Sequence, residues 1–223
     1  MTFLVACPFV HAPSFEIMWG QLHPELRERA IPIDNTELNL GAAGSRNLAQ
    51  RVAAERGVDW VVEVSPVVRF GPQGGLDFAR ALEDHADAWV VQSWAPLNWH
   101  LIAWSTGLPK RVGLWDENFW PVYGEDGDMS RRIHLAAAED GHAAAWACVP
   151  VDAWITMHGH SVRLANVQVD YPTIWSYYEA KWGGRSGEER FTRPFDAPDI
   201  PLSWWPSSPD PRAIERPRPR RRS

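Results

Sequence analysis

Five carboxylates stand close together between residues 116 and 128, and aromatic residues separate them. The surrounding stretch, residues 113–132, reads GLWDENFWPVYGEDGDMSRR. An aromatic neighbour excludes water from a carboxylate, so the pattern suggests a pocket that presents a desolvated carboxylate to a polar ring. Glu125 and Asp126 stand where a helix is expected to begin, and the helix dipole favours negative charge there. The alternative is an acidic helix cap with a solvated face.

Two further segments carry recognisable patterns. Residues 41–66 read GAAGSRNLAQRVAAERGVDWVVEVSP, in which Gly41 and Gly44 precede an expected helix and a β-branched strand follows. Residues 176–184 read SYYEAKWGG. Glycine turns before helices are common, so these two segments gain meaning only together with the carboxylate stretch.

The carboxylate stretch resembles the acceptor-side motif GxFDExFxxYxEDxDxxxR of inverting GT-A glycosyltransferases of the family-2-like group. The positions that match are Gly113, Asp116, Glu117, Phe119, Tyr123, Glu125, Asp126, Asp128 and Arg132, with Trp115 in place of the phenylalanine. Residues 41–66 resemble the group's donor-loop segment at Gly41, Gly44, Arg46, Asn47 and Asp59, and residues 176–184 resemble a YxxKWG element of small, including bacteriophage, members. The resemblance covers about residues 1–195. One departure is that Gly141 follows Arg132 by nine residues, where the group has a glycine after about five.

The resemblance implies an enzyme that transfers a sugar, of the hexose type, from a nucleotide donor to a hydroxyl group with inversion. It assigns Asp126 the role of the base that deprotonates the acceptor hydroxyl. The donor, most readily a UDP-sugar, is expected to contact residues from three segments. These donor-binding residues are Pro8, Asp34 (at the nucleobase), Arg46, Glu63 and Ser65, while Trp115, Asp116 and Glu125 are expected on the acceptor side.

A second departure concerns the metal site. The group holds a divalent ion on the diphosphate with carboxylates after the central strand, where this chain has Ser65-Pro66-Val67. Glu63 lies two residues earlier, on the same side of the strand as Ser65. We therefore expect Glu63 and His158 to hold Mn²⁺ or Mg²⁺, although His158 is equally well interpreted as a structural histidine. The alternative is neutralisation of the diphosphate by Arg163 or Lys181 without metal.

Alternating strand and helix patterns predict an α/β fold, a single GT-A (Rossmann-like) domain with a mostly parallel central sheet. The domain is expected over residues 1–195, and residues 196–223, rich in proline and arginine, are expected to form an extended or disordered tail. Strands are predicted at 3–6, 30–33, 60–64, 88–92 and 145–151. Helices are predicted at 14–29 with an interruption near Pro24, and at 45–56, 76–85, 126–140 and 175–182.

The distribution of charge bears on the acceptor. The chain has a net charge of −6, but residues 212–223 contain six arginines and one acid, so the rest carries −11. An arginine-rich tail attracts polyanions, and tryptophans between residues 94 and 120 can stack on an exposed base. The YxxKWG element resembles that of phage-encoded enzymes, some of which glycosylate hydroxylated bases in phage DNA. This resemblance, together with the tail, makes hydroxymethylated pyrimidine in phage DNA the first acceptor hypothesis, although the acidic body weighs against it. A protein or a cell-surface glycan is the alternative acceptor.

Other classes are less consistent with the sequence. A non-catalytic nucleotide-sugar-binding domain would explain the missing carboxylates but has no use for the Glu125-Asp126 pair. A nucleotidyltransferase would need glycine and lysine after the first strand, and residues 7–14 contain neither. The sequence has no apolar run of the roughly 18–20 residues that a membrane helix needs, and it has only two cysteines, Cys7 and Cys148. We therefore expect a cytoplasmic protein with reduced thiols and no membrane partner.

Overall fold

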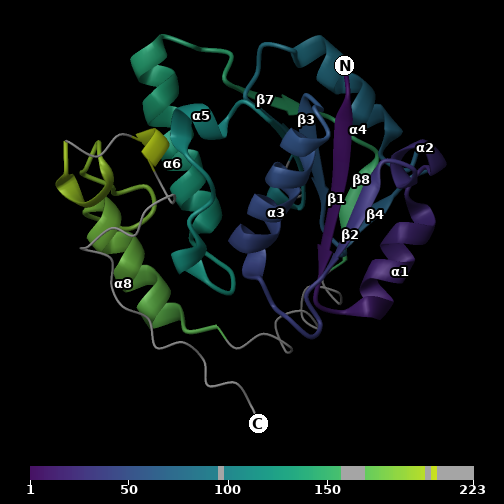
Figure 1. Ribbon diagram of the computed structural model, residues 1–223, viewed down its shortest axis with the longest axis horizontal. Coiled ribbons are helices and arrows are strands. Elements are labelled where there is room, and N and C mark those ends of the chain that lie inside the picture. The colour runs from purple at the N-terminus through teal and green to yellow at the C-terminus, as the bar shows by residue number, and fades with distance from the viewer. Residues whose placement is uncertain (95–97, 157–168, 199–201, 205–223) are drawn as a thin grey trace.

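The computed structural model of the chain describes residues 1–94, 98–156, 169–198 and 202–204. Its centre is a six-stranded sheet with the order β2-β1-β3-β6-β5-β7 (Figure 1). The strands are β1 (Phe3–Phe9), β2 (Ala30–Asp34), β3 (Trp60–Val64), β5 (Val90–Ser93), β6 (Leu101–Ser105) and β7 (Trp146–Val149). A second, two-stranded sheet pairs β4 (Val68–Phe70) with β8 (Ala153–Ile155).

The central sheet is mostly parallel, as the sequence predicts. Strand β1 pairs in parallel with β2 and with β3, and β5 pairs in parallel with β7. The exception is β6, which runs antiparallel to both of its neighbours, β3 and β5. The α/β class is therefore confirmed, with one reversed strand near the middle of the sheet.

Seven α-helices surround the sheet within the described residues. They are α1 (Ala12–Gln21), α2 (Pro24–Arg27), α3 (Gly41–Glu55), α4 (Leu76–Ala81), α5 (Pro109–Val112), α6 (Glu125–Asp140) and α8 (Tyr171–Trp182). Short 3-10 helices lie at Leu82–His85, Asn98–His100, Glu117–Phe119, Pro194–Asp196 and Leu202–Trp204.

Two apolar clusters cover the two faces of the sheet, because successive strand side chains point to opposite sides. Leu4 and Ala6 of β1 belong to the cluster that includes residues of α3, α5, α6 and α8. Val5 and Cys7 belong to the cluster that includes residues of α1, α2 and α4. Figure 1 shows this division, with α3, α6 and α8 on one side and α1 and α2 on the other.

Several element boundaries differ from the sequence prediction. The expected helix at 14–29 is two helices, with Pro24 opening the second. The helix expected at 45–56 begins at Gly41, so Gly41 and Gly44 lie in its first turn and not before it. Gly41 has φ +74°, and a Cβ there would lie 2.8 Å from the carbonyl oxygen of Pro121. Glycine is therefore required by this close approach of two backbone segments.

Strands β4, β6 and β8 are absent from the sequence prediction. Strand β6 has the sequence LIAWS and is buried over its first four residues, so it shows no polar alternation that would mark a strand. Near the C-terminus, Ala197 and Leu202 are buried, and Leu202 belongs to the cluster that covers the α3 face. The packed part of the chain therefore includes Leu202, and the tail boundary at 195 stays a prediction.

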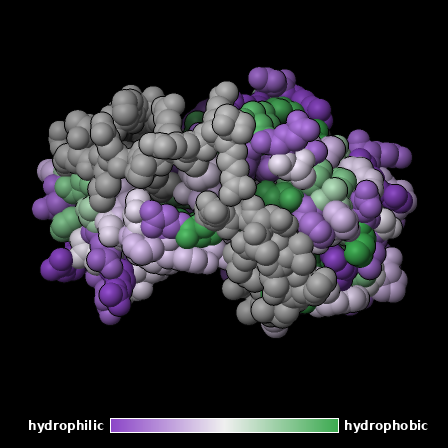
Figure 2. Space-filling model, turned by 90° about the horizontal axis from the view of Figure 1, so that it is seen from below, coloured by the Kyte–Doolittle hydropathy of each residue, from purple (hydrophilic) through white to green (hydrophobic). Residues whose placement is uncertain are grey.

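The hydropathy of the surface varies across the face drawn in Figure 2. Hydrophilic side chains cover much of the described part of this face, with smaller apolar areas between them. Among the described residues, no helix combines the length and the apolar composition needed to cross a bilayer.

Candidate active site

A cavity of about 310 Å³ opens at the carboxyl ends of β1 and β3. Strands β2 and β3 flank β1 on opposite sides, so this edge is a topological switch point, where open α/β sheets bind ligands. The wall combines the end of β1, the residue after β2, the first turns of α3, the end of β3 and the first turn of α6. Pro8, Asn35, Arg46, Ser65 and Asp126 represent these five segments.

Arg46 of α3 ties two of the cavity carboxylates together. Its Nε lies 2.8 Å from Glu63 Oε2 and its Nη2 lies 3.0 Å from Glu63 Oε1, so both oxygens of Glu63 accept from one guanidinium. Its Nη1 lies 3.3 Å from Glu125 Oε1. The guanidinium carbon also lies 4.3 Å from the ring centroid of Trp115, a cation–π geometry. The side chains of Arg46, Glu63 and Glu125 are all buried, and these contacts offset the free-energy cost of burying their charges.

Glu125 and Ser65 each have a buried oxygen with which no described residue forms a hydrogen bond. Glu125 Oε2 and Ser65 Oγ have no hydrogen-bond partner among the described residues, and both residues line the cavity. Burial, together with the nearby charge of Asp126, raises the pKa of Glu125 to about 7, although Arg46 opposes the shift. Because an unpaired buried polar atom costs free energy, the two oxygens are suited to hydrogen bonds with a bound ligand.

Asp126 differs from its neighbour in exposure. It is half-buried, lines the cavity from the first turn of α6, and its Oδ1 accepts from the backbone N–H of Gly127 at 2.9 Å. Gly124, with φ +88°, precedes the helix, and a Cβ there would lie 2.7 Å from the Phe119 ring. The tight turn therefore places Glu125 and Asp126 at the helix start, where the dipole stabilises carboxylates.

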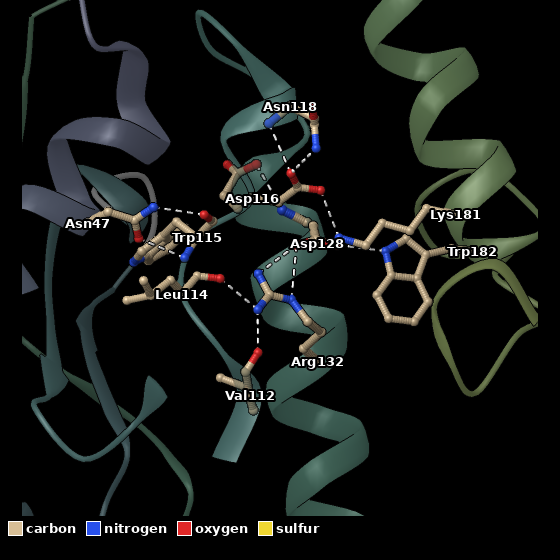
Figure 3. Close-up of polar contacts among 12 residues, drawn as sticks. Asn47, Val112, Leu114, Trp115, Asp116, Asn118, Asp128, Arg132, Lys181 and Trp182 are labelled. Atoms are coloured by element: carbon tan, nitrogen blue, oxygen red, sulfur yellow. Dashed lines mark hydrogen bonds and ion pairs between the residues drawn. The ribbon is translucent and has the colours of Figure 1, made fainter. Parts of the chain in front are cut away.

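A buried polar network lies behind this turn (Figure 3). Lys181 of α8 lies 2.9 Å from Asp116 Oδ2 and 2.5 Å from Asp128 Oδ1, and all three side chains are fully buried. Arg132 contacts Asp128 Oδ2 at 2.7 and 3.0 Å and donates to the carbonyls of Val112 and Leu114. The network joins α8 and the segment before α6 to the first two turns of α6.

No protein-family model and no curated protein matches the chain. Solved structures do match, among them three of S. aureus TarS. TarS 1–349 in complex with UDP is 11% identical (TM-score 0.47), and a second structure of TarS 1–349 is 13% identical (TM-score 0.48); each match covers 81% of this chain and 71% of the other. A third TarS structure is 12% identical with TM-score 0.50, over 80% of this chain and 43% of its own.

The chain has the GT-A fold. At this identity the likeness concerns the fold alone. The evidence that the cavity is a functional site therefore comes from the side chains of this chain and not from TarS.

Six of the ten residues predicted as catalytic, donor-binding, acceptor-side or metal-binding line the cavity. They are Pro8, Arg46, Glu63, Ser65, Glu125 and Asp126. Two acceptor-side predictions, Trp115 and Asp116, are buried and do not line the cavity. Trp115 packs under Arg46, and Asp116 accepts from Lys181, Tyr177 and Asn118. Both residues therefore contact the side chains and segments that form the cavity wall and do not themselves face the cavity.

Asp34 lies at the margin of the site. Its side chain is exposed, accepts from Thr36 N at 2.8 Å and Thr36 Oγ1 at 2.6 Å, and does not line the cavity. These two hydrogen bonds lower the pKa of Asp34 below its usual value. The next residue, Asn35, is buried, lines the cavity and donates to Ser45 Oγ at 2.9 Å. Sequence reasoning missed Asn35, whose only signal is its place directly after the strand.

The described residues do not fit a divalent metal ion. Both oxygens of Glu63 are engaged by Arg46, and the described part of the chain contains no group of three His, Cys, Asp or Glu side chains with metal-ligand geometry. His158, the second predicted ligand, and Arg163 lie outside the described residues. Lys181, the other cation considered for the diphosphate, is enclosed in the buried network and does not line the cavity.

Proposed function

We propose that this protein is a glycosyltransferase that moves a sugar from a nucleotide donor, most readily a UDP-sugar, to a hydroxyl acceptor with inversion. The observation that supports the proposal most directly is the placement of Asp126. It is a half-buried carboxylate at a helix N-terminus that faces a cavity at the switch point of a GT-A sheet. The motif resemblance independently names the same residue as the base.

In the proposed reaction, an oxygen of the acceptor hydroxyl attacks the anomeric carbon of the donor sugar. The bond from that carbon to the diphosphate oxygen breaks on the opposite side, and the nucleoside diphosphate leaves with the electron pair. Asp126 accepts the proton of the attacking hydroxyl, which is general base catalysis. The unpaired Oε2 of Glu125 and Oγ of Ser65 are placed to hydrogen-bond sugar or acceptor hydroxyls.

The nucleotide is proposed to lie over the ends of β1 and β2. Pro8 and Asn35 line this end of the cavity, and Asp34 stands at its margin, where it can reach a nucleobase that extends beyond the cavity. Arg46 supplies positive charge on the cavity wall, although it already pairs with Glu63 and Glu125. The described side chains offer no site for a metal ion on the diphosphate.

Replacing Asp126 tests the proposal. Asp126→Asn should cut transfer by roughly 10²–10⁴-fold and leave the affinity for the nucleotide sugar nearly unchanged, since the amide cannot accept the proton. Asp84→Asn, at an exposed position of the 3-10 helix Leu82–His85, is the matched control. Transfer by the Asp126 variant within tenfold of the unmodified protein would remove Asp126 from the role of base.

A second candidate function is a nucleotide-sugar-binding domain without catalysis. The observation that favours it is the loss of both expected carboxylates at Ser65 and Val67, together with the capture of Glu63 by Arg46. This candidate predicts donor binding by calorimetry without release of nucleoside diphosphate, whether or not an acceptor is present.

The acceptor and the location of the protein are further parts of the proposal. The hypothesis of hydroxymethylated pyrimidine in phage DNA depends on the arginines of residues 212–223, which lie outside the described residues. A cytoplasmic location is supported by the two cysteines, Cys7 and Cys148, which are both free thiols.

A further inference from the structure

A row of partly exposed aromatic side chains leads from the cavity along α8. Tyr123 lines the cavity two residues before Glu125, and its ring stacks on that of Tyr171, with centroids 5.4 Å apart and an angle of 26° between the planes. Trp175 follows Tyr171 by four residues, so the two lie on the same side of the helix about 6 Å apart along its axis. The three residues Tyr123, Tyr171 and Trp175 are called the aromatic row below.

The row continues the apolar stripe of α8 beyond the core. The buried residues of this helix are Ile174, Tyr177, Tyr178 and Trp182, together with the ion-paired Lys181. Tyr171 and Trp175 lie on the same side of the helix as Tyr178 and Trp182, and the rings of Trp175 and Tyr178 meet edge to face with centroids 5.9 Å apart. The core covers these two side chains only in part, since Tyr171 is 43% exposed and Trp175 is 37% exposed.

The backbone at Tyr123 adds a second observation. Tyr123 has φ +79°, in the left-handed region that a bulky L-residue rarely adopts. Such a conformation costs free energy and persists only where the surroundings enforce it. Here the strained turn places the Tyr123 ring on the cavity wall, which Asp126 also lines, and stacks it on Tyr171. The aromatic row therefore connects directly with the cavity.

The charges on α8 distinguish between classes of ligand. Its two charged side chains are Lys181, which is fully buried in ion pairs, and Glu179, which is exposed and pairs with Arg185. Proteins that stack nucleic-acid bases on aromatic rings do so in a positively charged groove. Exposed rings beside carboxylates, on a helix whose only cation is buried, suit a neutral ligand with an apolar face and many hydroxyl groups.

We propose that the aromatic row is an acceptor subsite, on which the sugar rings of a neutral oligosaccharide stack while its terminal hydroxyl reaches Asp126. This inference rests on the proposed glycosyltransferase function and adds the class of acceptor. The rings of Tyr171 and Trp175 are spaced to contact successive sugar units, because one helical turn separates them. Asp126 and the Oε2 of Glu125 then accept hydrogen bonds from the hydroxyl groups of the sugar unit inside the cavity.

The experiment uses the full chain with neutral malto-, cello- and chito-oligosaccharides as probes, and a single-stranded DNA that contains hydroxymethylcytosine as the competing class. Saccharide binding is measured by ligand-observed NMR, and transfer is measured with a UDP-sugar that the protein hydrolyses. The variants are Tyr171→Ala, Trp175→Ala and Trp175→Phe. The matched control is Trp154→Ala, since Trp154 is 50% exposed and β8 lies far from α8 in Figure 1.

The expected result is binding of at least one saccharide, weakened roughly tenfold by each alanine variant. The acceptor KM should rise by the same factor with little change in kcat, Trp175→Phe should retain most of the binding, and the control should match the unmodified protein. Donor hydrolysis without acceptor should be equal in all variants.

Three results would overturn the inference: no saccharide bound at millimolar concentration, saccharide binding that survives both alanine variants, or transfer to the DNA and to no saccharide. If donor hydrolysis continues in any of these cases, the proposed function survives and only the acceptor class is wrong. If the protein neither binds nor hydrolyses a nucleotide sugar, the proposed function itself fails, and the acceptor inference fails with it.

Discussion

Replacement of Glu125 by glutamine should make the protein more stable at alkaline pH. The carboxyl group is buried, and its pKa rises from the ordinary value of 4.5 to about 7 because burial and Asp126 disfavour its charge. Between these two values the folded protein holds a proton that the unfolded chain has released. The folded state is therefore favoured below pH 4.5, and this contribution is lost as the pH rises through 7.

The size of the effect follows from the size of the shift. One pKa unit corresponds to 1.36 kcal/mol, so the shift costs about 3 kcal/mol of stability once Glu125 is ionised. Glutamine keeps the shape of the neutral carboxyl group and cannot ionise. We therefore expect Glu125→Gln to match the unmodified protein near pH 4.5 and to exceed it by about 3 kcal/mol above pH 8, which is roughly 6–12 °C in Tm for a chain of this size.

The assay is thermal unfolding followed by circular dichroism at pH 4.5, 6.5 and 8.5. Glu16→Gln, on the exposed side of α1, is the control for loss of one negative charge. The decisive quantity is the change of the Tm difference with pH. If Glu125→Gln is less stable than the unmodified protein at pH 8.5, the ion pair with Arg46 outweighs burial, and the reasoning from desolvation is wrong.

Two further predictions concern the network behind the cavity and the metal. Lys181→Met should destabilise the protein by about 3–5 kcal/mol at pH 7, measured by the denaturant midpoint, because it leaves buried Asp116 and Asp128 without a shared cation. Although burial opposes its ionisation, Arg132 and Lys181 hold the pKa of Asp128 below its ordinary value of 3.8, so this stability is present above pH 3.8 and is lost as the pH falls below it. The penalty of the variant should shrink in acid, and an equal penalty at pH 3 and pH 7 would contradict the ionic explanation. Treatment with EDTA should leave donor turnover unchanged, since Arg46 engages both oxygens of Glu63. A rate that falls in EDTA and returns with Mn²⁺ would show that side chains outside the described residues complete a metal site.

Much of the site was accessible from local patterns. The spacing of acids and aromatic residues in 113–132 placed Glu125 and Asp126 at a helix start, and the structure puts both on the cavity wall. The strand at 60–64 and the glycine-led helix before it were likewise predicted, because β-branched runs and glycines carry their conformational preferences in the chain itself. The α/β class followed from the alternation of such segments.

Tertiary structure decided which polar residues face the cavity and which face one another. From sequence, Asp116 and Asp126 are both acids of one motif, yet Asp116 is buried against Lys181 from α8, 65 residues away, and Asp126 lines the cavity. The sequence predicts Glu63 as a metal ligand, but in the structure both of its oxygens accept hydrogen bonds from Arg46, 17 residues earlier.

Strand β6 is missing from the sequence prediction because it is buried on both sides and therefore lacks the alternation of apolar and polar residues that indicates a strand. The amino-acid sequence by itself determined the local elements, since their signals lie within a few residues of one another. The pairing of charges depends on contacts between distant segments, and only the folded chain brings those segments together.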